Sequence, residues 1–519
     1  MLKATLLALI VFINTIKIRG KNMFKECNLN DLSKMDIKEV EMMDDKLHEE
    51  CGVFGIYSPS GGEVSKDVYY GLIALQHRGQ EACGIAVSDT SGEKGNLKLK
   101  KNMGLVSEVF HKEDFSNLKG NIGVGHVRYS TTGGSVVENA QPIAMNYIKG
   151  SLALVHNGNI VNAKELKEEQ MYRGLAHYTT TDSEVLAYEI IGDRVNSGSI
   201  EEAIKKSASK LKGGFAVVVM SPRKLVGIRD PFGIKPLVLG VKNNFVDGKG
   251  EQGSLFDNEK FDEHNTYILA SESSAIRAVG GKVIRDIKPG EIISITSKGI
   301  TSDYDLCQEK KAHCIFEYIY FARNDSVMDG IAIHTAREMA GRALARKSKV
   351  DADIVVGVPE SGIPAAMGYS KEANIPYVQA FYKNSYIGRS FIKPTDEERR
   401  DAVHMKLSVL EDEVKDKNIV IIDDSIVRGT TMKQLIIMLK QAGAKAVHVR
   451  ISSPPFLYPC YYGTDVPTSK QLIASKHSNE DVRKNIGADS LEYLSIEDFK
   501  YMVGDLQICK ACFNNDYPV

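Results

Sequence analysis

Residues Asn418–Thr431 read NIVIIDDSIVRGTT, and this stretch decides how the second half of the chain is expected to fold. Its apolar part, Ile419–Ile422, consists of β-branched residues, which predicts a buried parallel strand. After the stretch, apolar residues recur at helical spacing as far as Gly443, a residue type that commonly ends helices. The sequence therefore predicts a strand, a short polar loop and a helix in direct succession.

The loop between this strand and this helix has the composition of an anion-binding site. Asp423 and Asp424 end the strand, and Gly429 is followed by two threonines. Backbone N–H groups at the start of a helix favour a phosphate, and adjacent carboxylates suit ribose hydroxyls or Mg²⁺. The predicted ligand therefore carries a phosphate at one end and a diol or metal ion at the other. The alternative for two aspartates alone is an ordinary acidic turn, and the loop lacks the Gly-Lys-Thr of the Walker pattern.

The complete pattern of strand, DDSIVRGTT and helix resembles the fingerprint of the phosphoribosyltransferases. In that family the loop binds the 5-phosphate of phosphoribosyl pyrophosphate (PRPP), and the two acids face the ribose hydroxyls. Strands and helices alternate between residues 316 and 486, which predicts a parallel sheet with crossover helices. The other strands expected in this region are Ile354–Val358, Tyr377–Phe381 and Ala446–Ile451.

Two further loops fit this resemblance. Residues Val358–Pro364 follow a predicted strand, and the resemblance implies that they bind pyrophosphate. Residues Lys383–Ile392 resemble the loop that closes over PRPP, with Ser385 where family members often have arginine; a solvated basic turn is the alternative. The resemblance places Mg²⁺ on Ser361, Asp423 and Asp424. The residues that it assigns to PRPP are Glu360, Ser361, Gly362, Lys383, Arg389, Asp423, Asp424, Ser425, Arg428, Gly429, Thr430 and Thr431.

In the first half of the chain, polar clusters stand at the edges of short apolar runs. Cys51 opens one such run, CGVFGIY, and LQHRGQ (75–80) precedes another. The same arrangement recurs at GHVRYSTTG (125–133), LVHNGN (154–159) and TDSE (181–184). Binding and catalytic residues concentrate at such strand ends and loops. A lone cysteine at a strand start is more simply a buried core residue, so the later clusters are what favour a site.

These clusters together resemble the class II glutamine amidotransferases, which use an N-terminal nucleophile cysteine. With the phosphoribosyltransferase fingerprint behind them, the chain from Cys51 onward resembles the amidophosphoribosyltransferase family. The resemblance implies glutamine-dependent amination of PRPP to 5-phosphoribosylamine, with release of glutamate and pyrophosphate, as the first committed step of de novo purine biosynthesis. The ammonia is expected to cross inside the protein from Cys51 to the PRPP site.

The resemblance also implies the fold and the domain organisation. An α+β N-terminal-nucleophile glutaminase domain, with antiparallel sheets stacked between helices, is expected to precede an α/β phosphoribosyltransferase domain with a parallel sheet. The expected segments are a leader that is removed (1–50), the amidotransferase domain (51–296), the phosphoribosyltransferase domain (297–490) and a C-terminal segment with cluster-binding cysteines (491–519).

Removal of the leader has a chemical reason at Cys51. A free α-amino group has a pKa of about 8, so it can take the proton of the thiol on the same residue. The thiol has an ordinary pKa of about 8.5, and its thiolate is the effective nucleophile. While Cys51 lies inside the chain, its nitrogen is an amide and cannot act as a base. An uncut leader is therefore expected to abolish glutaminase activity.

Within the leader, the apolar run Ala4–Ile13 has three interpretations. It is too short to span a bilayer securely, and no small-residue cleavage site follows it. The interpretations are a signal or anchor, an amphipathic or buried N-terminal segment, and an upstream start codon included before a true start such as Met23.

The resemblance gives the polar clusters of the first half individual roles. Arg128 is expected to bind the α-carboxylate of glutamine with its guanidinium fork, and Asp182 to bind the α-amino group. Asn157 and the N–H of Gly158 are expected to form the oxyanion hole for the tetrahedral intermediate. Alone, Arg128 also fits a surface ion pair and Asn157 a turn. Two more residues are expected to shape the pocket around Cys51, namely Arg78 and Thr131.

Four cysteines in the second half of the chain are candidates for a metal site. Cys509 and Cys512 form a C-x-x-C motif, with Cys314 and Cys460 earlier in the chain. The motif alone indicates zinc, redox chemistry or nothing specific, and four thiolates can hold either zinc or an iron–sulfur cluster. The resemblance to the iron–sulfur-containing branch of the family implies a [4Fe–4S] cluster on all four. No role is assigned to Cys27, Cys83 and Cys307.

Composition and charge are those of an ordinary globular protein. The 519 residues are 43% hydrophobic and 26% charged, and 66 basic against 67 acidic side chains leave a net charge of −1. This balance predicts neither nucleic acid nor an anionic membrane as a partner. Eight cysteines do not indicate a secreted disulfide scaffold. The resemblance implies a cytoplasmic homotetramer that is inhibited by purine nucleotides.

Two other functions compete with this enzyme. Phosphoribosyltransferase-like folds also serve as regulators that bind PRPP without chemistry, but the complete set of Cys51 motifs and the lack of a basic nucleic-acid-binding extension count against a regulator. A class II amidotransferase with a different acceptor is the other alternative, and DDSIVRGTT counts against it.

Overall fold

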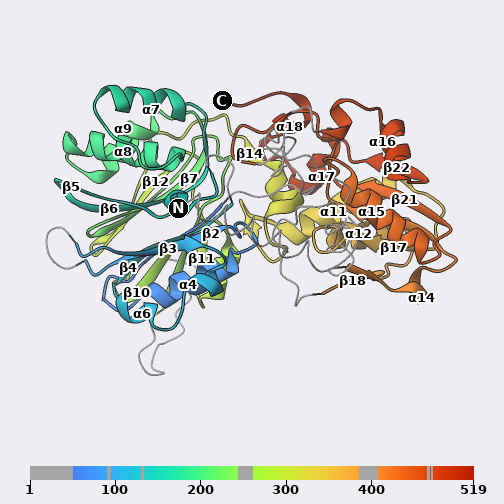
Figure 1. Cartoon of the computed structure of the whole chain (residues 1–519), viewed down its shortest axis with the longest axis horizontal. Coiled ribbons are helices and arrows are strands. Elements are labelled where there is room, and N and C mark those ends of the chain that lie inside the picture. Colours follow the sequence, from blue (N-terminus) through green and yellow to red (C-terminus); the bar gives the residue numbers. More distant parts are fainter. Residues whose placement is uncertain are drawn as a thin grey trace, which may run out of the picture. The chain divides into compact units, whose positions relative to one another are not determined.

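The computed structural model describes residues 51–90, 95–129, 134–243, 261–384, 407–464, 468 and 472–519, and Figure 1 shows their elements. Several predicted features lie outside the described residues: the leader with its apolar run, Thr131, Ser385 and Arg389. Among the described residues, no helix is long and apolar enough to cross a membrane.

The first half of the chain contains two antiparallel sheets. One has seven strands in the order β11 (Lys282–Asp286), β9 (Val238–Asn243), β10 (Asn265–Ala270), β1 (Cys51–Tyr57), β4 (Ile122–Arg128), β2 (Ala82–Ser88) and β3 (Lys98–Met103). The other has six in the order β13 (Gly299–Asp303), β12 (Ile292–Thr296), β8 (Lys224–Arg229), β7 (Gly213–Ser221), β6 (Gly150–Ile160) and β5 (Ile143–Tyr147). The six-stranded sheet thus continues through β13, beyond the predicted boundary at residue 296.

Side chains that alternate along each strand fill separate layers of the core. Val53 of β1 packs between the two sheets with Val155 of β6, whereas Phe54 faces outward onto a helix layer. The helices over the outer faces are α4 (Ser65–Ala74) and α10 (Ser273–Ala278) on one side, and α7 (Ala163–Tyr172), α8 (Asp182–Val195) and α9 (Ile200–Ala208) on the other (Figure 1). The predicted arrangement of stacked antiparallel sheets between helices is confirmed.

The second half contains a four-stranded parallel sheet in the order β17 (Ile354–Gly357), β20 (Asn418–Asp423), β21 (Ala446–Ile451) and β22 (Ser490–Tyr493). Both faces of β20 are buried, because Ile419 and Ile421 pack toward one helix layer and Val420 and Ile422 toward the other. This explains why the four central residues of the strand, Ile419–Ile422, are all apolar. The covering helices are α11 (Ile333–Ser348), α12 (Gly362–Ala373), α15 (Thr430–Gln441), α16 (Asn479–Ile486) and α17 (Phe499–Val503). β22 continues this sheet across the predicted boundary at residue 490.

One strand prediction was wrong in its bounds. The strand is β18 (Phe381–Lys383), which pairs antiparallel with β19 (Leu407–Val409), and Tyr377 makes only a single parallel bridge to Val355. The remaining short elements include the π-helix η2 (Glu317–Phe321), α5 (Val106–Val109), α6 (Asp114–Asn117), α14 (Glu411–Val414), α18 (Ala511–Asn514), β14 (His313–Cys314), β23 (Ile508–Cys509), β15 (Val327–Met328) and β16 (Ile331–Ala332).

Candidate active sites

Cys51 and Arg128 stand opposite each other at one edge of the seven-stranded sheet. Cys51 begins β1, the middle strand, and its Cα partner on β4 is Arg128, the last residue of that strand. Side chains of directly opposite residues point to the same face of a sheet. Both are nearly enclosed, with Cys51 8% and Arg128 3% exposed. The guanidinium of Arg128 lies 3.4 Å from Oε1 of Glu81, so the structure places a carboxylate-binding cation on the strand next to the thiol.

Asn157 and Gly158 lie on β6, which is joined to β4 by a hydrogen bond between His126 Nε2 and the backbone oxygen of His156, 3.0 Å apart. Gly158 has φ +131°, and a Cβ there would lie 2.1 Å from the backbone oxygen of Gly214. The side-chain amide of Asn157 is fully buried, and neither its N nor its O has a hydrogen-bond partner among the described residues. A buried amide with unused donors is suited to an oxyanion.

Asp182 begins α8 and is fixed against β6. Its Oδ2 accepts a hydrogen bond of 2.9 Å from the N–H of Ile160, and its Oδ1 lies 3.8 Å from Nδ1 of His156. Burial lowers the pKa of His156, although the Asp182 carboxylate opposes this effect. Burial also lowers the pKa of His126 to about 3. Both imidazoles are therefore neutral at neutral pH, so they hold the strands together without adding charge.

Arg78 is completely buried and joins the two halves of the chain. Its Nε donates to Glu272, and its Nη2 donates to Oε2 of Glu317 over 2.7 Å. Glu272 also accepts hydrogen bonds from His77 Nε2 (2.7 Å) and from the hydroxyl of Ser326 (2.6 Å). The cationic groups around Glu272 hold its pKa well below its usual range against the effect of burial.

Sequence reasoning missed Glu272 and Glu317. Glu272 lies in the polar run 271–274 directly after β10, which is the same strand-edge signal that marked the other clusters. Glu317 lies three residues after Cys314, but nothing in the sequence indicates its partner, because Arg78 lies far away along the chain.

The aspartates of DDSIVRGTT lie at the carboxyl end of β20, as predicted. Both Asp423 and Asp424 are 4% exposed. Asp424 accepts hydrogen bonds from the hydroxyls of Ser361, at the start of α12, and Ser425, the latter over 2.5 Å. The structure thus brings together Ser361, Asp423 and Asp424, the three residues assigned to Mg²⁺, although Ser361 and Asp424 are 63 residues apart in the sequence. Oxygen ligands of this kind are those that Mg²⁺ prefers.

The loop after Asp424 leads directly into a helix. Gly429 has φ +85° and precedes Thr430, the first residue of α15. A left-handed residue at this point turns the chain so that the first N–H groups of α15 face the loop. Across the loop, Lys383 Nζ lies 3.2 Å from Oε1 of Glu360, so two residues assigned to PRPP form an ion pair in this structure. Three more residues assigned to PRPP lie in the same segments. Gly362 begins α12, Arg428 lies in the loop before α15, and Thr431 is the second residue of α15.

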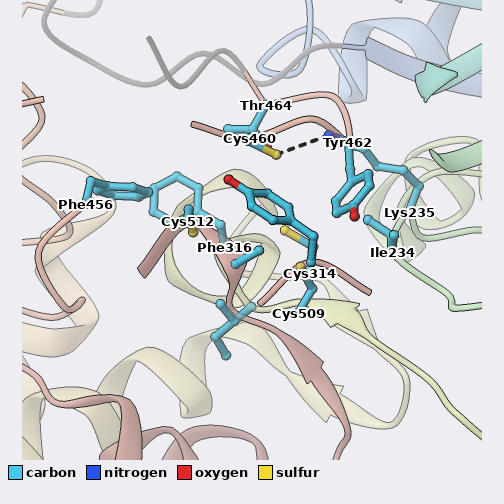
Figure 2. A pocket seen from close by; sticks show the side chains of 13 residues that line it. Ile234, Lys235, Cys314, Phe316, Phe456, Cys460, Tyr462, Thr464, Cys509 and Cys512 are labelled. Atoms are coloured by element: carbon cyan, nitrogen blue, oxygen red, sulfur yellow. Dashed lines mark hydrogen bonds between the residues drawn. The ribbon is translucent and has the colours of Figure 1, made fainter. Parts of the chain in front are cut away.

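Cys314, Cys460, Cys509 and Cys512 line one pocket. Figure 2 shows their sulfur atoms around the same space, with Phe316, Phe456 and Tyr462 among its walls. β14 and β23 pair in parallel with Cys314 opposite Cys509, and the N–H of Tyr462 donates to Sγ of Cys460 over 3.4 Å. Burial raises the pKa of Cys509 to about 12. In the described part of the chain, no group of three or more His, Cys, Asp and Glu side chains is arranged to hold a single metal ion.

Comparison with known proteins identifies the family. Residues 126–248 match the family model of the glutamine amidotransferase domain, and residues 328–452 match that of the phosphoribosyl transferase domain. The chain is 43% identical over 483 residues to the amidophosphoribosyltransferase of Methanocaldococcus jannaschii, a match that covers 90% of this chain and 97% of the relative. This chain belongs to the amidophosphoribosyltransferase family. The Bacillus subtilis amidophosphoribosyltransferase is likewise 43% identical over 479 residues, which cover 91% of this chain and 94% of the relative.

Solved structures agree with this assignment to the amidophosphoribosyltransferase family. The glutamine PRPP amidotransferase of B. subtilis, complexed with ADP and GMP, matches with a TM-score of 0.79 and 41% identity over 90% of this chain and 97% of that chain. A structure described as the allosteric regulatory enzyme of purine biosynthesis matches with a TM-score of 0.80 and 42% identity over 90% and 96%. The family, the two-domain fold class and the enzymatic function in glutamine-dependent amination of PRPP, as predicted from the sequence, are confirmed.

Proposed function

We propose that Cys51, freed by removal of residues 1–50, is the nucleophile of a glutaminase site that supplies ammonia to a PRPP site at Asp423–Thr431. The observation that carries this proposal is the register of β1 and β4, which sets Cys51 opposite Arg128. A nucleophile and a carboxylate-binding guanidinium on one face, beside the unpaired amide of Asn157, can bind and cleave glutamine.

In the first half-reaction, the free α-amino group of Cys51 takes the thiol proton, and the thiolate attacks the side-chain amide carbon of glutamine. Arg128 binds the α-carboxylate of glutamine and Asp182 its α-amino group. The negative charge that develops on the amide oxygen is stabilised by Asn157 and the N–H of Gly158. The C–N bond then breaks, ammonia leaves with the proton, and water hydrolyses the thioester to glutamate. Arg78 supports the wall of this site through Glu272, and Thr131 is assigned to the same pocket.

In the second half-reaction, ammonia crosses inside the protein and attacks C1 of PRPP. The bond from C1 to the pyrophosphate oxygen breaks, and 5-phosphoribosylamine and pyrophosphate are released. The N-terminus of α15, with Thr430 and Thr431, binds the 5-phosphate, and Asp423 and Asp424 face the ribose hydroxyls. Ser361, Asp423 and Asp424 are suited to hold Mg²⁺, which would neutralise charge on the leaving pyrophosphate. Lys383 and Arg389 belong to the loop assigned to close over PRPP.

Cys314, Cys460, Cys509 and Cys512 are proposed to hold a [4Fe–4S] cluster. Four sulfur donors around one largely apolar space fit a cluster, whose ligands stand farther apart than the ligands of one zinc ion. Cys314 on β14, Cys509 on β23 and Cys512 on α18 would hold the cluster together with Cys460, and the bound cluster would then link these three elements.

We also propose that the protein is a cytoplasmic homotetramer inhibited by purine nucleotides. The complex of the B. subtilis relative with ADP and GMP supports the binding of purine nucleotides. Nucleoside phosphates would compete for the anion-binding loop at the start of α15.

Glutamate release from glutamine, measured on anaerobically purified protein that begins at Cys51, tests this function. Release that rises steeply when PRPP and Mg²⁺ are added, matched by pyrophosphate, is the expected result. Release that is indifferent to PRPP would indicate an amidotransferase with another acceptor. No release at all would favour a regulator that binds PRPP without chemistry.

A further inference from the structure

The cysteine pocket contains a buried positive charge. Lys235 is 1% exposed and, among the described residues that line the pocket, it is the one with a charged side chain. Figure 2 shows it on the side of Tyr462, facing the space around the sulfurs. Its Nζ donates to the backbone oxygen of Gly463 over 3.0 Å and lies 6.0 Å from the centre of the Phe321 ring. A buried ammonium is costly unless negative charge lies near it.

The backbone of Lys235 is fixed by two buried charged residues of the turn after β8. Nε of Arg229 donates to the backbone oxygen of Lys235 over 2.8 Å, and the N–H of Lys235 donates to Oδ2 of Asp230 over 3.0 Å. Arg229 is itself held by the carboxylate of Asp329, with 2.7 Å between Nη1 and Oδ1. The lysine is therefore placed by a rigid frame rather than by a flexible surface loop.

Lys235 lines the same pocket as Cys314, Cys460, Cys509 and Cys512. Four thiolates around a [4Fe–4S] core carry a net charge of about −2, in a pocket where low polarity strengthens electrostatic interactions. The first-half domain thus contributes a cation to a site whose sulfur ligands all come from the second half.

We propose that Lys235 is the counter-charge of the iron–sulfur cluster, a positioning residue that sets its reduction potential and its resistance to air. The inference rests on the proposed cluster at Cys314, Cys460, Cys509 and Cys512. A fixed positive charge stabilises the more negative state of a redox group, so it makes reduction easier and loss of an electron to oxygen harder. Through Lys235, the first half of the chain therefore influences the stability of the cluster that the second half holds.

The test compares Lys235→Met, which removes the charge at similar volume, with Lys235→Arg, which keeps it. Lys242→Met is the matched control, because Lys242 pairs with Asp67 outside the pocket. Anaerobic full-length enzyme is analysed for iron and acid-labile sulfide, for the midpoint potential by electron paramagnetic resonance, and for the rate at which the brown colour bleaches in air. In Lys235→Met we expect the one-electron equilibrium to shift at least tenfold toward the oxidised state, about 59 mV, and bleaching to be severalfold faster. Lys235→Arg and Lys242→Met should resemble the parent enzyme.

The outcomes separate this inference from the cluster proposal. Parent enzyme without iron and sulfide would mean that the cluster itself is wrong. A cluster in the parent and in Lys235→Met with the same potential and bleaching rate would overturn the role of Lys235. Loss of the cluster from Lys235→Met but not from Lys235→Arg would support it, whereas loss from both would show that space, not charge, matters.

Discussion

The guanidinium of Arg78, in the first half of the chain, is bound by the carboxylate of Glu317 in the second half, with 2.7 Å between Nη2 and Oε2. Both side chains are buried, at 0% and 3% exposure. Arg78 belongs to the cluster LQHRGQ that precedes β2, and Glu317 begins the π-helix η2, so this pair joins the first half of the chain to the second.

Replacing Glu317 by glutamine should destabilise the fold. The substitution keeps the shape but removes the charge that faces buried Arg78, and we expect the free energy of unfolding to fall by about 1.5–3 kcal/mol. Urea denaturation followed by circular dichroism measures this loss. Glu338→Gln is the control, since Glu338 pairs with Arg342 and Lys371 nearer the surface and should change stability by less than about 1 kcal/mol. Equal stability of the two variants would contradict a structural role for the buried pair.

Replacing Asn157 by alanine should lower glutaminase turnover. If the unpaired amide of Asn157 binds the oxyanion, kcat should fall by about 10²–10³, with little change in KM for glutamine. Steady-state glutamate release in the presence of PRPP measures this. Asn146→Ala, at an exposed position on β5, should behave as the parent enzyme. A variant that instead raised KM at unchanged kcat would place Asn157 in substrate binding.

Replacing Asp424 by asparagine should weaken PRPP binding by about 10- to 100-fold, since a charge-assisted hydrogen bond and a magnesium ligand are lost together. Calorimetric titration of PRPP in the presence of Mg²⁺ measures the affinity. Ammonia-dependent product formation should fall in parallel, while PRPP-independent glutamate release stays at the parent's level. Asp412→Asn in exposed α14 is the control. Unchanged PRPP affinity would remove Asp424 from the site.

Acid should weaken the fold partly through His126. Burial lowers the pKa of His126 to about 3, whereas an unfolded imidazole has a pKa of about 6.5. Between these values the unfolded chain binds the extra proton, so the free energy of unfolding falls as the pH falls, by about 1.4 kcal/mol per pH unit. The free energy of unfolding is measured for the parent and for His126→Gln at pH 7 and at pH 5. Its decrease from pH 7 to pH 5 should be about 2 kcal/mol smaller in the variant. An equal decrease in both proteins would show that protonation of His126 on unfolding does not contribute to the acid sensitivity.

Keeping the leader attached should abolish glutaminase activity but spare the use of free ammonia. Protein that begins at Cys51 is compared with protein that retains residues 1–50, with the N-terminus verified by mass spectrometry. The uncut form should release almost no glutamate, because its Cys51 nitrogen is an amide, yet it should still make pyrophosphate from PRPP and ammonium. An uncut chain with full glutaminase activity would refute the role of the α-amino group.

The sequence predicted those elements that are determined by residues close together along the chain. The strand, loop and helix around Asp423 and Asp424 follow from a run that is buried on both faces and a loop that must begin a helix. The stacked sheets of the first half came from family resemblance, because alternating strands do not reveal which sheet each one joins. Contacts between distant segments, such as Arg78 with Glu317 or Lys235 beside Cys314, leave no local pattern and required the structure. The strand expected at Tyr377–Phe381 was wrong in its bounds, because Phe381–Lys383 pairs with β19, a partner far away along the chain.

The parallel pairing of β14 with β23 can form only at the end of translation. β23 is made after every other strand that the structure describes, and it sets Cys509 opposite Cys314. Much of the nascent chain can therefore fold on the ribosome while Cys314 and Cys460 still lack their two partners. The proposed cluster would therefore gain its full set of four cysteines only after the last strand of the chain has been made.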